Sequence, residues 1–289
     1  MKKFNKYILA FLFAIPASNV YAACSGESCC TVSSGVISLS EGEGCNYEPD
    51  SYSIKMFKMH LCTSEPSAPT TSAATGYAAA GCELIIEASA GTSVTITPGG
   101  DTQTFTGATL YRPAEGAYTH GVVLIDNVFT IEMDKEFSAT MTGADSSTGK
   151  YCATVTGSAD ETTGGSTTCS TSDNLTAGSW GAILTSFDGL GQPLDVEVEE
   201  TNLNGSGADI SGYLVTSSEV LAQSRGTVTD LIGIQTFATP VVVTKDFKGL
   251  NIAFGINQGS HVWDNSGGET IEVEIGSGPF QAIITPLNY

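Results

Sequence analysis

The chain has 289 residues, of which 31 are acidic and 11 are basic, and its formal net charge is −20. A surface this negative repels phosphate backbones and anionic lipid headgroups, which argues against nucleic acid as a partner and favours cations. Charged residues make up only 15% of the chain, below the ~25% typical of globular domains. Together with 33 glycines and many Ser and Thr residues, this composition favours strands and tight turns over long helices.

The first 22 residues, Met1–Ala22, have the parts of an export signal peptide. Three lysines precede an apolar run at Tyr7–Ile15, and Ala22 places a small residue at the expected cleavage point. The alternative is a membrane anchor, but this run is shorter than the ~20 apolar residues of a spanning helix, and no later segment reaches that length. Cleavage removes three of the 11 basic residues and leaves 8 against 31 acidic ones, a net charge of −23.

Eight cysteines follow the expected cleavage point. An even number of cysteines in an exported chain predicts disulfide bonds. Two spacings suit local loop closure, those of Cys62 with Cys82 and of Cys152 with Cys169, and the connectivity otherwise stays open. A zinc site is the alternative, although no pair of CxxC knuckles occurs, and lipid attachment at the first cysteine is another. The eight are Cys24, Cys29, Cys30, Cys45, Cys62, Cys82, Cys152 and Cys169.

Short apolar segments, many of them alternating with polar residues, predict strands throughout the first part of the chain. For one of them, Val122–Met133, a single long strand and two strands around Asp126 and Asn127 are both open interpretations. A low-complexity loop of Ala, Ser, Thr and Pro separates the first strand from the next. The predicted strands are Ser51–Leu61, Glu83–Ala88, Thr92–Thr97, Val122–Met133 and Lys150–Thr156.

Gly157–Asn174 reads as a linker, because it is rich in Gly, Ser, Thr and Asp and lacks large apolar residues. Beyond it, further strands are predicted, and the continuous run Pro240–Thr244 is typical of a strand buried on both faces. We therefore predict an all-β chain with two β-sandwich or jelly-roll-like domains: a disulfide-stapled one at residues 23–170 and a cysteine-free one at residues 171–289. The later strands are Leu194–Glu200, Pro240–Thr244, Asn251–Ile256, Thr270–Ile275 and Phe280–Thr285.

Signatures of catalysis are scarce. The chain has no GxSxG, HExxH or GxxxxGK[ST] motif, and its only histidines are His60, His120 and His261. His120 is a candidate base or ligand, and the alternative is a polar residue at the start of a strand. Paired carboxylates of the glycosidase kind stay open, but 31 acidic residues make such a pattern unspecific.

Calcium is the cation that the abundant oxygen ligands favour, and no other cofactor is expected. The segment Asn204–Asp209 resembles one turn of the glycine-rich RTX calcium repeat, although Asn204 stands where the repeat has Gly and Ser211 where it has an apolar residue. The resemblance implies a calcium ion held by Asn202, Asn204 and Asp209. A glycine-rich hairpin loop is the alternative.

The C-terminus resembles the final strand of chaperone–usher pilins, in which a glycine, alternating apolar residues and a near-terminal tyrosine form an edge that a chaperone reads. Pro286 departs from that pattern. The resemblance implies an assembly edge, and the alternative is a strand that closes a sheet. Its residues are Phe280, Ala282, Ile284, Leu287 and Tyr289.

We expect a non-catalytic secreted or cell-surface protein with a structural or adhesive role. Export, β-rich domains and disulfide bonds are typical of such proteins, and strand edges offer a route to assembly with other copies or with surface proteins. Two alternatives are retained. One is a secreted module that binds calcium or a glycan, for which Trp180 and Trp263 are the available aromatic platforms. The other is a secreted hydrolase that uses paired carboxylates.

Overall fold

The computed structural model describes residues 29–98, 105–160, 163–187, 197–201, 203, 206–266 and 270–288. The predicted signal peptide and Cys24 lie outside these residues. The described part of the chain consists almost entirely of strands, which confirms the prediction of an all-β fold. No helix in this part is long and apolar enough to cross a membrane.

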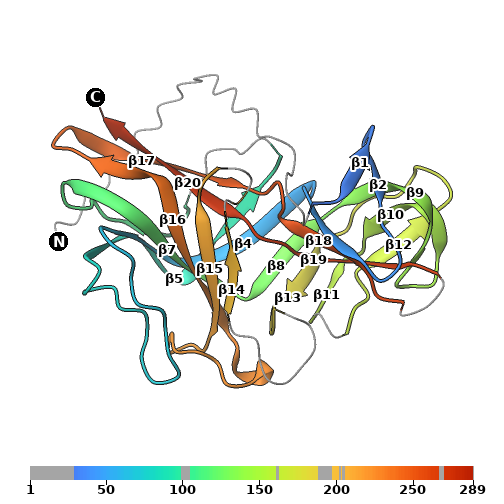
Figure 1. Ribbon diagram of the computed structural model, residues 1–289, viewed down its shortest axis with the longest axis horizontal. Helices are drawn as coiled ribbons and strands as arrows, with labels where there is room; N and C mark the ends of the chain where they lie inside the picture. The colour runs from blue at the N-terminus through green and yellow to red at the C-terminus, as the bar shows by residue number, and fades with distance from the viewer. Residues whose placement is uncertain are drawn as a thin grey trace.

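The larger sheet has ten strands within the described residues (Figure 1). At its centre, β4 pairs with β5 along one edge and with β7 and β8 along the other. A path of hydrogen-bonded strands runs through β11 (Gly157–Asp160), β13 (Trp180–Ile183), β8 (Val128–Glu132), β4 (Ser51–Cys62), β7 (Gly116–Asp126), β16 (Asp230–Val243), β15 (Asp209–Val215) and β14 (Glu197–Glu200), and β5 (Cys82–Ile96) carries β6 (Thr109–Leu110).

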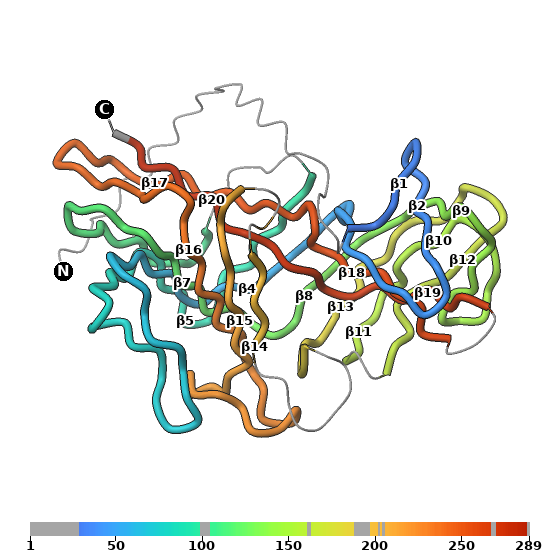
Figure 2. Tube along the Cα trace, in the orientation of Figure 1, coloured from blue at the N-terminus to red at the C-terminus, as the bar shows by residue number. Residues whose placement is uncertain are grey.

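A second sheet has eight strands, and a third has two, in the same described residues. Figure 2 shows β1, β2, β9, β10 and β12 gathered at one end of the molecule, whereas β17 extends toward the other. The second sheet follows the order β1 (Thr31–Ser33), β2 (Val36–Ser38), β9 (Asp134–Gly143), β19 (Glu272–Ser277), β18 (Ser260–Asp264) and β3 (Gly44–Tyr47), with β10 (Thr148–Thr154) and β12 (Thr167–Ser170) beside β9; the third is β17 (Phe247–Gly255) with β20 (Gln281–Asn288).

The structure settles or changes four of the predicted strands. Glu83–Ala88 and Thr92–Thr97 belong to one strand, β5, because a bulge opposite Phe57 absorbs the residues between them. Val122–Met133 forms two strands, β7 and β8, with Asn127 between them. The prediction that Pro240–Thr244 is buried on both faces is wrong: Val242 is 47% exposed, because side chains alternate between the faces at this end of β16.

Strands from both sides of residue 170 share the two large sheets. β16 pairs with β7 over most of its length, and β18 and β19 join the sheet of β3 and β9. The predicted linker Gly157–Asn174 contains β11 and β12, because backbone groups of small polar residues pair with neighbouring strands as well as those of larger ones do. The predicted division into residues 23–170 and 171–289 therefore does not coincide with a division between sheets.

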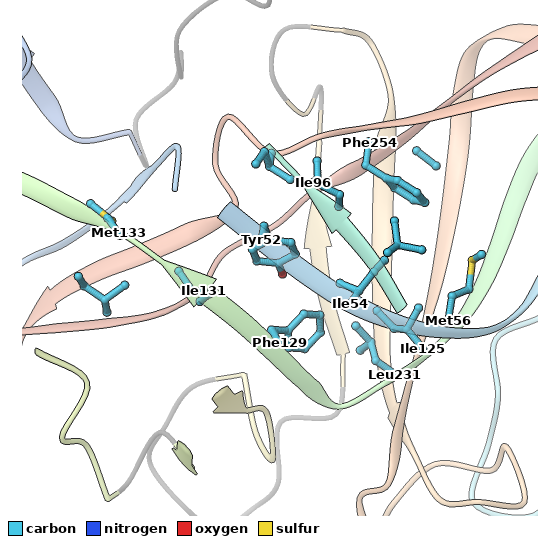
Figure 3. Close-up of a cluster of buried hydrophobic side chains, with 14 of the residues drawn as sticks. Tyr52, Ile54, Met56, Ile96, Ile125, Phe129, Ile131, Met133, Leu231 and Phe254 are labelled. Atoms are coloured by element: carbon cyan, nitrogen blue, oxygen red, sulfur yellow. The ribbon is translucent and has the colours of Figure 1, made fainter. Parts of the chain in front are cut away.

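The main core is one cluster that takes side chains from all three sheets. Figure 3 shows Tyr52, Ile54 and Met56 along β4, next to Phe129 and Ile131 of β8. All five are at most 3% exposed. Burial of large side chains of this kind stabilises the fold by ~1.5–3 kcal/mol each.

A smaller core covers the opposite face of the large sheet. Val122 and Leu124 of β7 and Ile232 and Ile234 of β16 form it together with Ala80 of the loop that precedes β5. The central strands of this sheet are therefore buried on both faces. The Cys62–Cys82 disulfide closes the base of that loop over a sequence separation of 20.

Three disulfide bonds join the described cysteines: Cys30 with Cys45, Cys62 with Cys82, and Cys152 with Cys169. The predicted local closures are thereby confirmed. Cys62 lies directly opposite Cys82 in the register of β4 and β5, and Cys152 lies opposite Cys169 in that of β10 and β12. Cys29 is also disulfide-bonded, and no free thiol occurs among the described cysteines.

His60 belongs to a polar network at the edge of the smaller core. Its ring stacks on Tyr77 with 4.3 Å between centroids, and Tyr77 donates a hydrogen bond to Glu219, which also pairs with Lys58. Burial first, and the Lys58 ammonium second, lower the pKa of His60 from 6.5 to about 4, against weaker opposing effects of Glu219 and Glu87. The ring is therefore neutral at neutral pH.

Removal of the Cys62–Cys82 bond by the double substitution Cys62→Ser/Cys82→Ser is expected to lower the free energy of unfolding by ~3 kcal/mol, because it releases a constraint on the unfolded chain. Denaturant titration followed by circular dichroism measures the change. Wild-type protein under the same non-reducing conditions is the matched comparison, because the other disulfides then stay intact in both proteins. An unchanged midpoint in the double variant would show that the loop is held by its apolar contacts alone.

The stability of the protein is expected to fall as the pH drops from 6.5 toward 4. In the unfolded chain His60 takes up a proton near its ordinary pKa of 6.5, whereas in the folded protein it does so only near 4. The unfolded state thus binds more protons in this window. His60→Phe keeps a ring against Tyr77 and removes the titration, so it should flatten the decline in stability by on the order of 2 kcal/mol. Equal pH profiles for both proteins in denaturant titrations contradict this assignment.

Candidate functional site

Two adjoining hollows lie between the two large sheets, with volumes of about 390 and 340 Å³. They adjoin, because both are lined by Gly44, Leu184, Phe187, His261 and Ser277, and we refer to the two together as the cleft. We call the larger hollow the apolar half and the smaller one the aromatic half. Volumes of ~300–1,000 Å³ are typical of small-molecule sites.

One wall of the aromatic half is a single face of β18 and its neighbours. His261 and Trp263 are two residues apart on β18, so both project to the same side, and their rings stack with centroids 5.7 Å apart and planes at 22°. Gly276 of β19 lies beside them, and a Cβ atom there would come within 2.9 Å of the Trp263 ring. The absence of a side chain at Gly276 therefore makes room for the indole.

Trp180 of β13 contributes to the opposite wall. It is 7% exposed, and a Cβ atom on Gly157 of the neighbouring β11 would lie 3.0 Å from its ring. The chain contains two tryptophans, and the cleft brings both of them to one hollow. Sequence reasoning identified these residues as separate platforms, and their convergence follows from the pairing of strands that are distant in sequence.

Carboxylates also line the aromatic half, and backbone groups hold several of them. Glu274 of β19 is 1% exposed and accepts hydrogen bonds from the backbone N–H groups of Gly165 and Ser166 at 2.7 and 2.9 Å. The hydroxyl of Ser166 donates to it as well. A buried carboxylate with this many donors is satisfied, so it fixes the position of the loop before β12.

Asp264, at the end of β18, has a similar role. Its carboxylate accepts hydrogen bonds from the backbone N–H groups of Gly42, Ser266 and Glu272, each at 2.9 Å. Burial by itself would raise the pKa of Asp264, but these hydrogen bonds lower it below its ordinary value. Asp160 accepts two hydrogen bonds from Thr163. Because its pKa is lowered, Asp264 remains charged at neutral pH and is a poor general acid.

His261 lies where the two halves meet. Its Nδ1 is 2.8 Å from the side-chain oxygen of Asn46, so Nδ1 carries the proton and Nε2 is left as an acceptor. Burial lowers the pKa of His261, which favours the neutral ring. Ser277 stands nearby and bonds through its hydroxyl to the buried Tyr52 at 2.7 Å.

The apolar half lies over the inner face of the ten-stranded sheet. Its floor includes Gly121, Val123 and Ile125 of β7, together with Gly212 of β15 and Gly233 of β16. Gly212 and Gly233 lie directly opposite each other in the strand register. Mid-strand glycines weaken a sheet and often mark a close approach of a ligand or another backbone.

Few polar groups reach the apolar half. Gln235 of β16 uses its side-chain amide to donate to the carbonyl of Ala282 and to accept from its N–H, both at 2.8 Å. These two bonds attach β20 to the large sheet, much as a strand pair would. Glu200 of β14 also lines this half, and burial raises its pKa.

The structure does not show whether the three residues of the predicted calcium site lie together. Asn202 and Asn204 lie outside the described residues, and Asp209 is exposed at the start of β15. No group of three or more His, Cys, Asp or Glu side chains that suits a metal ion occurs among the residues the structure describes. The calcium site therefore stays a prediction.

The predicted assembly edge is distributed between core and surface. Phe280 packs 5.6 Å from Tyr52 and 6.1 Å from Phe254 between ring centroids, and Ala282 is buried. Ile284 packs against the main core, whereas Leu287 is 37% exposed; Tyr289 lies outside the described residues. Because Phe280 lines the apolar half of the cleft, it belongs to the candidate site rather than to a free strand edge.

Sequence reasoning missed three contributors to the cleft. It treated His261 as an isolated histidine, and it assigned no role to Glu274 or to the glycines of β7, β15 and β16. The alternation of His261, Val262 and Trp263 is a usable signal, since it places the histidine and the tryptophan on one face. His120, the candidate base, bonds instead to the neighbouring hydroxyl of Thr119 at 2.8 Å and lies outside the cleft lining.

Comparisons with protein-family models, with curated proteins and with solved structures gave no match for this chain. The geometry of the cleft is therefore the basis on which its function is inferred.

Proposed function

We propose that this chain is an exported, non-catalytic binding protein with an adhesive role, and that the aromatic half of the cleft binds an uncharged saccharide. The observation that carries the proposal is the convergence of Trp180 and Trp263 on one hollow rimmed by carboxylates. The disulfide bonds and the pattern of Met1–Ala22 support export.

The chemistry of the aromatic half suits a sugar ring. The C–H groups of a sugar pack against the negative face of an aromatic ring, and half-buried Trp263 presents such a ring. Sugar hydroxyls donate hydrogen bonds, for which the carboxylates of Asp160 and Asp264 and the Nε2 atom of His261 are acceptors. Lys and Arg are absent from the described lining, which disfavours anionic sugars.

The state of the carboxylates supports binding without catalysis. A glycosidase needs one carboxyl group with a raised pKa as its acid and a second as nucleophile or base. The hydrogen bonds to Asp264 shift its pKa downward, and Glu274 is fully engaged by Gly165 and Ser166. Glu200 has a raised pKa, but it lies in the apolar half. Hydrolysis can be tested with a panel of chromogenic glycosides. If the protein turns one of them over and Glu200→Gln abolishes that turnover, the protein is a hydrolase and the proposal of non-catalytic binding is wrong.

Substitution Trp263→Ala is expected to weaken saccharide binding about tenfold or more, because it removes a stacking platform worth ~1.5 kcal/mol. Both tryptophans of the chain line the cleft, so their fluorescence reports occupancy directly. A panel of neutral and acidic oligosaccharides is titrated against the mature protein, and Trp263→Phe should retain part of the affinity.

Tyr151→Ala is the matched control, since Tyr151 is a half-buried aromatic residue on β10 outside the cleft lining. It should leave saccharide affinity unchanged. Fluorescence that responds to no neutral oligosaccharide at millimolar concentration, with the protein folded, would falsify the proposed function.

Self-assembly is a second candidate function. β20 pairs through its backbone with β17, and no other strand pairs with it in the described part of the chain. Gln235 occupies the other edge of β20 at Ala282, and the part of that edge beyond Ala282, with the exposed Leu287, suits addition of a strand from another copy.

If this edge drives assembly, sedimentation velocity of the mature protein in 0.15 M salt (a concentration at which the Debye length is ~8 Å) should show concentration-dependent oligomers. Leu287→Lys should shift the population toward monomer, because it buries a charge in the contact. Val242→Lys changes an exposed apolar residue of another strand (47% exposed, against 37% for Leu287) and should have no such effect. Monomeric wild-type protein at every concentration rules out assembly through β20.

A further inference from the structure

We propose that the apolar half of the cleft binds an uncharged hydrocarbon chain, so that the complete ligand is an amphipathic saccharide such as a neutral glycolipid or an alkyl glycoside. This inference rests on the proposed function, since the sugar of the same molecule would occupy the aromatic half. It assigns a ligand class and a second subsite.

The adjacency of the two hollows is the first argument. His261 and Ser277 line both of them, and the ring of His261 stacks on that of Trp263 in the aromatic half. A ligand whose sugar rests on Trp263 therefore has its next atoms close to His261, where the apolar half begins.

The side chains around the apolar half are the second argument. Val123, Phe187, Val198 and Phe237 come from different segments, and each is only partly buried although each faces the hollow. In a protein whose other large apolar residues mostly lie in closed cores, a concentration of half-buried ones around one hollow indicates an apolar binding surface.

The glycines of the floor are the third argument. Gly212 and Gly233 sit opposite each other in the interior of β15 and β16, positions where glycine lowers the stability of a sheet. Neither has a positive φ angle, so no turn requires them. A Cβ atom on Gly233 would lie 3.2 Å from Val123, and one on Gly212 would lie 3.0 Å from Val198 and 3.4 Å from Phe187. The missing side chains therefore let apolar residues of the lining lie directly against the floor, which makes the floor of the hollow apolar.

Charge selects the kind of chain. Glu200 is the charged residue in the described lining of the apolar half, and neither Lys nor Arg occurs there. A free fatty acid would bring a second carboxylate into the same acidic cleft without a cationic partner, which is unfavourable. An alkyl or acyl chain joined to a neutral sugar avoids this cost.

The test compares octyl β-D-glucopyranoside with methyl β-D-glucopyranoside by isothermal titration calorimetry, below the concentration at which the octyl compound forms micelles. The octyl chain should raise affinity about tenfold or more, since each buried methylene group adds favourable transfer energy. Gly233→Val fills the apolar half and should abolish this gain while leaving the affinity for the methyl glycoside unchanged. Octanoate should bind more weakly than 1-octanol.

Gly249→Val is the matched control, because Gly249 lies mid-strand in β17, outside the cleft lining, with nothing closer to its Cβ position than Leu287 at 4.0 Å. It should keep the gain from the octyl chain, and thermal unfolding confirms that both variants fold.

Equal affinity for the octyl and methyl glycosides overturns the inference and leaves the proposed function intact. A gain from the octyl chain that persists in Gly233→Val overturns it as well, because the chain then binds elsewhere. If neither glycoside nor any oligosaccharide binds while 1-octanol binds in a Gly233-dependent manner, the proposed function fails and the amphipathic saccharide is excluded as the ligand class.

Discussion

The register of β4 is the constraint on which the rest of the structure depends. This strand carries β5 on one edge and both β7 and β8 on the other, so its side chains set the inner face of the whole ten-stranded sheet. A bulge leaves Phe57 without a counterpart in β7. The buried side chains are therefore at even positions up to Met56 and at odd positions from Met59 to Leu61. Without that extra residue, Met59 and Leu61 would point to the opposite face, so the main core would lose both side chains and the apolar half of the cleft would lose Met59 from its lining.

Burial on both faces follows from the same sheet and supports the floor of the cleft. The outer face of β7 and β16 is covered by the smaller core beneath the loop that Cys62–Cys82 closes. With that side sealed, the inner face can include Gly121, Gly212 and Gly233 without the sheet losing its support. The sheet can therefore leave the hollow unfilled on its inner face, because the smaller core stabilises its outer face.

Local pattern predicted much of the fold and little of the cleft. The strands of Ser51–Leu61 and the closures at Cys62–Cys82 and Cys152–Cys169 follow from alternation and spacing. The cleft depends on pairs such as His261 with Asn46, 215 residues apart, and on β18 lying between β3 and β19. Periodicity shows which face a side chain takes but not which strand lies beside it, so Trp180 and Trp263 were identified without their meeting being foreseen.

In the cleft, two of the chain's many acidic side chains have a structural role. Backbone N–H groups hold Glu274 and Asp264, so their charges serve to position loops and the end of β18 around the two tryptophans. The donors are Gly42, Gly165, Ser166, Ser266 and Glu272. A site fixed in this way loses little conformational entropy when a ligand binds. At the proposed sugar site, Asp160 and Asp264 offer acceptors to hydroxyl groups. Carboxylates thus order the walls, and their negative charge disfavours anionic ligands.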